Sequence, residues 1–252
     1  MKVMILCAGM GTRLKPWTEK HPKALVPVGG IPMLKRVGTN LIEQGFDEIT
    51  VNVHHFGDQI ISFIERDVAL RGKTAISDER DMLLDTGGGI LNAEDILNRD
   101  SRPFLVHNVD ILSNADLRKL MADHEGSDRH ATLLVSERAS DRKLVFDERM
   151  RLKGWLNRKS GDTRPSSLKI EESDRLLSFS GIYAMSPEVF RIMRSNGFCG
   201  RFPIMDFFLS FIPNLNIGGM VQEHLSIIDI GKPDTLHRAN LRINNICDAV
   251  TP

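Results

Sequence analysis

The sequence predicts an α/β protein built on a single Rossmann-like, doubly wound mixed sheet, and three observations point to this fold class. Segments typical of strands and helices alternate through the first half of the chain. An apolar run at residues 3–6 leads directly into a glycine-containing loop, as a first buried strand does when it ends at a ligand. The 252 residues are 41% hydrophobic and 26% charged, which suits a protein with one large core.

The elements of the first half follow from the pattern in chain order. The apolar run forms the first strand. Pro32 and Gly45 bracket the first helix, because proline suits an early helical position and glycine stops a helix. The alternation that follows predicts a mainly parallel sheet, whose ligands bind beyond the carboxyl ends of the strands. We expect strands at residues 2–7, 49–53, 74–77, 104–108 and 131–135, and helices at residues 32–44, 59–65, 89–97 and 116–124.

The pattern changes from about residue 143. Residues 144–155 predict a β-hairpin, and the polar segment 157–173 predicts a mobile loop without structure of its own, which we expect to order over bound substrate. No internal repeat or low-complexity segment is evident. The remaining expected elements are strands at residues 177–185 and 226–230 and helices at residues 187–193, 204–211 and 233–246.

Composition and charge exclude several classes of function. The 33 Lys and Arg residues balance the 33 Asp and Glu residues, so the chain lacks the overall basic charge of a nucleic-acid-binding protein. No apolar run is long enough to span a membrane, and the N-terminus does not resemble a signal peptide. The three cysteines, Cys7, Cys199 and Cys247, are odd in number and widely spaced, which predicts a reduced, cytoplasmic protein.

The most informative motif is the loop at residues 6–14 (LCAGMGTRL), followed by residues 22–27 (PKALVP). Glycines just past a strand let the backbone approach phosphate oxygens, while Arg13 and Lys23 add positive charge. This combination predicts a polyanionic ligand such as a nucleoside triphosphate. A Walker loop is absent, and a dinucleotide-binding turn is disfavoured because Leu14 stands where its last glycine belongs. A simple tight turn between strand and helix is the alternative for the glycines alone.

Together these two segments resemble the signature of the sugar-1-phosphate nucleotidyltransferases. Residues 85–90 (DTGGGI) are similar to the corresponding run of N-acetylmuramate-1-phosphate uridylyltransferases. Residues 108–110 (NVD) and 228–233 (IDIGKP) resemble the two metal-aspartate motifs of the family, and residues 179–183 (FSGIY) resemble its sugar-site segment. The resemblance implies the nucleotidyltransferase fold.

The resemblance also implies a domain organisation. We expect a single nucleotidyltransferase domain over residues 1–252, with a nucleotide-binding half (1–135) and a sugar-phosphate-binding half (136–252). We expect no β-helix domain, because the chain ends soon after the last expected helix.

The implied reaction needs charge neutralisation rather than a general base, because the attacking phosphate oxygen is already ionised. Arg13 would hold the β- and γ-phosphates and the leaving pyrophosphate, and Lys23 would bridge the α-phosphate and the sugar phosphate. Two carboxylates beside phosphate oxygens suit Mg²⁺. The implied site comprises catalytic Arg13 and Lys23; nucleotide-binding Ala8, Gly9, Met10, Gly11, Thr12, Thr86, Gly87 and Asn108; sugar-binding Gly181; and metal-binding Asp110 and Asp229.

Several of these residues also allow structural interpretations. Asp110 could cap the following helix, although Ser113 and Asn114 stand closer to its start. Phe179 and Tyr183 could belong to an alternating strand core rather than to a sugar site. The three glycines at 87–89 would let a flat base lie against bare backbone.

Two departures from the family pattern concern ligand binding. Val109 replaces the glycine that many relatives carry before the first metal aspartate, which predicts a less close approach of ligand there. Residues 154–159 (GWLNRK) replace a Glu-Lys-Pro run that binds sugar hydroxyls.

The sequence therefore favours a Mg²⁺-dependent enzyme that joins a nucleoside triphosphate, UTP by resemblance, to a sugar 1-phosphate such as N-acetylmuramate 1-phosphate. A mannose-1-phosphate guanylyltransferase and a catalytically silent, nucleotide-binding regulatory protein are the alternatives. We expect no nucleic-acid or membrane partner, and a monomer or homodimer.

Overall fold

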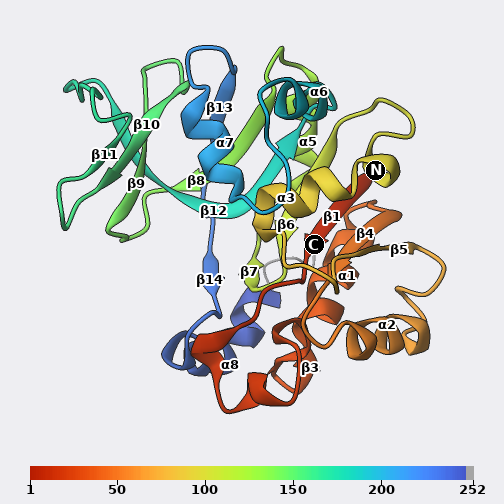
Figure 1. The fold of residues 1–252 in the computed structure, drawn as a ribbon. Helices are drawn as coiled ribbons and strands as arrows, with labels where there is room; N and C mark the ends of the chain where they lie inside the picture. The colour runs from red at the N-terminus through yellow and green to blue at the C-terminus, as the bar shows by residue number, and fades with distance from the viewer. Residues whose placement is uncertain (248–252) are drawn as a thin grey trace.

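The structure, a computed structural model, describes residues 1–247 and confirms an α/β fold on one large mixed sheet (Figure 1). The sheet has ten strands in the order β11-β10-β9-β12-β6-β1-β4-β5, with β8 paired to β12 and β13 paired to β8. Its strands are β1 (Lys2–Leu6), β4 (Glu48–Val53), β5 (Thr74–Asp78), β6 (Phe104–Asn108), β8 (Ala131–Ser136), β9 (Arg142–Phe146), β10 (Leu152–Asn157), β11 (Thr163–Arg164), β12 (Arg175–Met185) and β13 (Ile217–Val221).

The first half of the chain forms the parallel part of the sheet. Strand β1 lies between β4 and β6 and is parallel to both, with Val3 opposite Ile49 on one side and Leu105 on the other. The carboxyl ends of β1, β4 and β6 therefore meet at one edge, as the sequence predicts. The second half is different: β12 runs antiparallel to β6, β8 and β9, and the β9–β10 hairpin and β11 extend the sheet further. Antiparallel neighbours can be joined by short turns and need no helical crossover.

Helices cover both faces of the sheet, which confirms the doubly wound arrangement. Side chains of β1 alternate between two cores, with Val3 and Ile5 in one and Met4 and Leu6 in the other. The first core is covered by α1 (Met33–Glu43), α2 (Gly57–Arg66), α5 (Leu117–Glu125) and α8 (Pro233–Cys247), and the second by α3 (Asp85–Asn92), α4 (Glu94–Leu97), α6 (Glu188–Ser195) and α7 (Ile204–Ser210).

Short elements near the strand ends carry much of the function-relevant geometry, and among them the sequence predicted only the strand expected at residues 226–230. Strand β7 (Ile111–Ser113) pairs antiparallel with β14 (Ile227–Asp229), so the segment after β6 is held against the segment before α8. Strands β2 (Pro27–Val28) and β3 (Ile31–Pro32) form a second small ribbon. Strand β13 was also not predicted, because glycine, which is depleted in strands, occupies two of its five positions.

Two predicted segments need correction. The helix expected at residues 89–97 begins earlier, at Asp85, and is interrupted at Ala93, so the three glycines lie inside α3 rather than in a loop before it. The polar segment expected to lack structure contains β11, which pairs with β10 through Arg164 opposite Trp155. No helix in the described part of the chain is long and apolar enough to cross a membrane.

Candidate active site

The glycine loop follows β1 directly and is open to solvent. Gly9 and Met10 are exposed, and a Cβ atom on Gly9 would meet no protein atom within 4 Å. Within the described residues, the backbone N–H groups of Gly9, Met10 and Gly11 donate to no protein acceptor. Unpaired N–H groups around open space can hold an anion.

Gly11 allows the loop to pack against Lys23. Its φ of 63° lies in the left-handed region, which favours glycine. A Cβ atom at this position would approach the Cβ atom of Lys23 and the Cγ2 atom of Thr18 to 2.9 Å each. The Thr18 hydroxyl donates to the Gly11 carbonyl at 2.9 Å and fixes the turn. The stem of Lys23 therefore lies directly against the loop.

Four charged residues predicted to act together do lie together. The Lys23 ammonium donates to Oδ2 of Asp110, and each side chain is only 14% exposed. Oδ1 of Asp229 and Nη2 of Arg13 lie 2.8 and 2.9 Å from the place where a Cβ atom on Gly231 would stand, and Oδ2 of Asp110 lies 3.4 Å from it. The pairing of β7 with β14 makes this possible, since Ile230 N donates to the Asp110 carbonyl at 2.9 Å.

The donor set fits a magnesium ion. Asp110 and Asp229 offer carboxylate oxygens close to one point, and Mg²⁺ prefers one or two carboxylates with phosphate oxygens and water completing the shell. Among the described residues, no cluster of three or more His, Cys, Asp or Glu side chains is placed to bind a metal without help from a ligand. Asp110 does not cap α5, whose N-cap is Asp116, with its carboxylate accepting from Lys119 N at 2.8 Å; Ser113 and Asn114 are not the cap either.

Val109 does not obstruct the site as its sequence position suggested. Its side chain is 3% exposed and belongs to the first core, so it points away from the ligand side of the strand end. Next to it, Asn108 faces Gly181 across β6 and β12. A Cβ atom on Gly181 would lie 2.7 Å from Nδ2 of Asn108, and Gly181 has a φ of 81°. Glycine is therefore required at 181 for close packing as well as for conformation.

The three glycines of α3 serve packing, which corrects the expectation of bare backbone for a base. Cβ atoms at positions 87, 88 and 89 would lie 2.3 Å from the Phe202 ring, 2.1 Å from the Gly200 carbonyl oxygen and 2.6 Å from Oε1 of Glu79, respectively. The N–H of Gly87 donates to the Phe202 carbonyl, and the Thr86 hydroxyl accepts from Ile204 N, both at 2.9 Å. Base binding by Thr86 and Gly87 stays a prediction.

A cavity of about 1000 Å³ opens beside the four charged residues. Arg13, Asn108, Gly181 and Asp229 line it, so sequence-predicted residues from both halves of the chain share one space. Phe179 also lines it, whereas Tyr183 is 1% exposed and packs in the second core. The two aromatic residues therefore divide between the site and the core.

Several residues of this region were missed by sequence reasoning. Arg138 and Lys143 line the cavity, and the signal available was one basic residue just after an apolar strand and another at the start of the next strand. A buried polar network was also missed: Asn52 accepts from Cys7 N at 2.7 Å and donates to Glu79 at 2.8 Å. Burial raises the pKa of Glu79. This network ties the end of β1 to the segment before α3.

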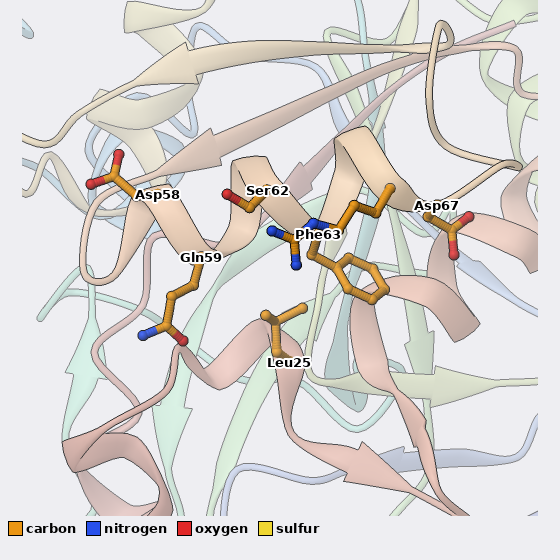
Figure 2. Close-up of a pocket in the computed structure, with 7 residues that line it drawn as sticks. Leu25, Asp58, Gln59, Ser62, Phe63 and Asp67 are labelled. Carbon is orange, nitrogen blue, oxygen red and sulfur yellow. The ribbon is translucent and has the colours of Figure 1, made fainter.

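A second hollow, shown in Figure 2, lies between Leu25 and helix α2 and has a volume of about 560 Å³. Asp58, Gln59, Ser62 and Phe63, all from this helix, line it. It contains none of the predicted phosphate-binding or metal-binding residues, so the larger cavity is the candidate active site.

Comparisons with known proteins identify relatives of this chain. The sequence profile of the family described as nucleotidyl transferase matches residues 2–144. Over 109 residues the chain is 38% identical to an N-acetylmuramate alpha-1-phosphate uridylyltransferase of Caulobacter vibrioides, a match that covers 42% of this chain and 44% of the relative. Over 211 residues it is 26% identical to mannose-1-phosphate guanylyltransferase 1 of Arabidopsis thaliana, covering 73% of this chain and 58% of the relative. The matches thus span about half the length of these curated relatives.

The fold is also shared with solved structures. A UDP-glucose pyrophosphorylase complexed with UDP-glucose superimposes with a TM-score of 0.76 at 17% sequence identity, covering 97% of this chain and 98% of the other. At this identity the likeness concerns the fold, and it bears out the predicted nucleotidyltransferase fold.

Proposed function

Because the chain belongs to the nucleotidyl transferase family, we propose that it transfers a nucleoside monophosphate from a nucleoside triphosphate to a sugar 1-phosphate and releases pyrophosphate. The observation that carries the proposal is the meeting of Arg13, Lys23, Asp110 and Asp229 around Gly231, beside the open glycine loop. Two cations and two carboxylates at one strand edge match a reaction that brings two phosphorylated substrates together.

The reaction needs no proton transfer. A non-bridging oxygen of the sugar phosphate attacks the α-phosphorus, and the bond from that phosphorus to the oxygen bridging to the β-phosphate breaks. The bridging oxygen keeps the bonding electron pair and leaves with pyrophosphate. The site must therefore neutralise charge and align the two substrates, which repel each other in water.

The position of each residue indicates which phosphate it would contact. The N–H groups of the loop from Ala8 to Thr12 would cradle the triphosphate, and Arg13 would hold the β- and γ-phosphates as pyrophosphate departs. Lys23 lies against Gly11 and beside Asp110, between the loop and the carboxylates. It would contact the α-phosphate and the incoming sugar phosphate.

Magnesium is the proposed metal. Asp110 and Asp229 would hold it, and when bound it supplies positive charge to the phosphate oxygens on which negative charge develops. Lys23 must share Asp110 with the ion, so the contact between Lys23 and Asp110 has to rearrange when ligand and metal bind.

UTP is the proposed nucleotide, supported by the relative from Caulobacter and by the resemblance of residues 85–90 to uridylyltransferases. Thr86, Gly87 and Asn108 are the proposed contacts on the nucleotide side. The guanylyltransferase of Arabidopsis supports a GTP-dependent alternative, which a comparison of kcat/KM for UTP and GTP with the same sugar phosphate resolves. A clear preference for GTP would assign the chain to the alternative.

N-acetylmuramate 1-phosphate or a similar sugar is the proposed acceptor, with Gly181 in its site and with residues 1–135 and 136–252 as the nucleotide and sugar-phosphate halves of one domain. The unpaired thiols of Cys7 and Cys199 support a cytoplasmic location. The test is a pyrophosphate-release assay across four nucleoside triphosphates and a panel of sugar phosphates. Nucleotide binding without any release would favour the silent regulatory protein.

A further inference from the structure

The cavity wall is strongly basic. Six basic side chains line it, whereas Asp162 and Asp229 are the only acidic lining residues among those that the structure describes. Arg13 and Lys232 belong to the region of the reacting phosphates. The remaining four basic residues come from the β8–β11 region: Arg138, Arg142, Lys143 and Arg164.

Lys143 is the most unusual of these residues because it is buried without a carboxylate partner. Its side chain in β9 is 5% exposed, and among the described residues no carboxylate lies within ion-pair distance of it. Its ammonium donates to the Arg138 carbonyl at 2.7 Å and to the Ser178 hydroxyl at 2.9 Å, which leaves one of its three N–H donors free. A buried, uncompensated ammonium is costly.

Arg138 shares this wall and also has an unused donor. One of its terminal nitrogens donates to the Phe179 carbonyl at 2.8 Å. Its Nε atom is buried and has no acceptor in the described structure. Two neighbouring cations that both lack an anion, and that both line one cavity, indicate an anion from outside the chain.

We propose that Lys143 and Arg138 bind a second anionic group of the sugar substrate, a carboxylate, in addition to the 1-phosphate. The inference rests on the proposed function, since it assigns a substituent of that acceptor sugar. The 1-phosphate already has Arg13, Lys23 and the Asp110–Asp229 metal site. The wall built by β8, β9 and β12 therefore has no reacting phosphate left to neutralise.

Such a subsite determines specificity. A neutral sugar would leave both cations unpaired, the buried Lys143 and the partly buried Arg138. Sites built to pair with a polar group reject analogues that lack it. N-acetylmuramate 1-phosphate and N-acetylglucosamine 1-phosphate differ only in a lactyl ether that carries a carboxylate, so they form a matched pair of probes.

The test compares kcat/KM for these two sugars in the full chain and in the variants Lys143→Met and Arg138→Met. A hydrogen bond to a charged group contributes about 1.5–3 kcal/mol, so each variant should lower the ratio of acidic to neutral kcat/KM by about tenfold or more. Lys73→Met, on an exposed turn outside the cavity, is the matched control and should leave the ratio unchanged. Thermal unfolding checks that each variant folds, and Arg138→Met decides alone if Lys143→Met does not fold.

The outcomes separate the inference from the function on which it rests. Equal use of both sugars by the wild type, or equal losses on both in the variants, would overturn the carboxylate subsite while transfer activity stands. A preference for glucose 1,6-bisphosphate over the carboxylate sugar would overturn the choice of carboxylate. If no sugar supports transfer, the proposed function fails, and calorimetric affinities for the matched pair then test the subsite by themselves.

Discussion

Alanine at Gly9 and at Gly11 should have opposite effects on the protein, because the structure surrounds the two glycines differently. Gly11 has a φ of 63°, and a Cβ atom there would lie 2.9 Å from side-chain atoms of Lys23 and Thr18. Left-handed backbone costs an L-residue about 1–2 kcal/mol, and overpacking adds about 1–3 kcal/mol. Gly9 is outside the left-handed region, and its added Cβ would meet no protein atom within 4 Å.

Gly11→Ala should therefore lower the melting temperature by several degrees, at about 2–4 °C for each kcal/mol in a chain of this size. Gly9→Ala should leave it unchanged or slightly raised, since alanine restricts the unfolded chain. In the same variant, nucleotide affinity measured by calorimetry should fall, because the space above Gly9 is where we place the triphosphate. Unchanged nucleotide affinity in Gly9→Ala would refute the phosphate-binding role of the loop, and an undiminished melting temperature in Gly11→Ala would refute the packing argument.

Three further predictions concern charge. Arg13→Ala and Lys23→Ala should each lower kcat by about a hundredfold or more, corresponding to about 2.7–4 kcal/mol of lost transition-state stabilisation, and unchanged kcat in both would leave the loop as a turn. Asp110→Asn and Asp229→Asn should abolish turnover while circular dichroism shows that the fold is kept, and EDTA should stop the wild-type reaction. Full activity in the presence of chelator would refute the metal requirement. Burial lowers the pKa of His107 and of His124 to about 4 in the folded protein. The unfolded chain therefore binds protons more readily at these residues, so their contribution to stability is complete above about pH 6.5 and is lost as the pH falls toward 4. The free energy of unfolding should drop by up to about 3 kcal/mol for each group over that window, and His107→Asn should show a shallower pH dependence than the wild type.

Local patterns predicted most of the regular elements but not the contacts that assemble the site. The apolar run before Gly9 and the Pro32–Gly45 bracket located β1 and α1 closely, because burial and helix-end preferences act over a few residues. The three glycines of α3 gave a wrong prediction of bare backbone for a base. The sequence does not reveal whether a ligand or the protein itself occupies the space beside a glycine. Here Phe202, Gly200 and Glu79 occupy it.

The long-range parts of the site needed the fold. Asp229 approaches Asp110 because the three-residue strands β7 and β14 pair. A strand was expected at residues 226–230, but β7 and its pairing with β14 were not, because so short a strand gives little periodic signal. In the sequence, nothing distinguishes Lys143 from an ordinary charged residue at the start of a strand. Its burial depends on β12, which supplies Ser178, and on Arg138 from the end of β8.

Direct detection of the product tests the central claim most sharply. The full chain, incubated with UTP, Mg²⁺ and N-acetylmuramate 1-phosphate, should form the UDP-sugar and pyrophosphate in equal amounts, measured by mass spectrometry and a coupled phosphate assay, and Asp110→Asn should form neither. Absence of any nucleotide sugar with all four nucleoside triphosphates and the whole panel of sugar phosphates, while calorimetry shows that nucleotide binds, would contradict the transferase assignment.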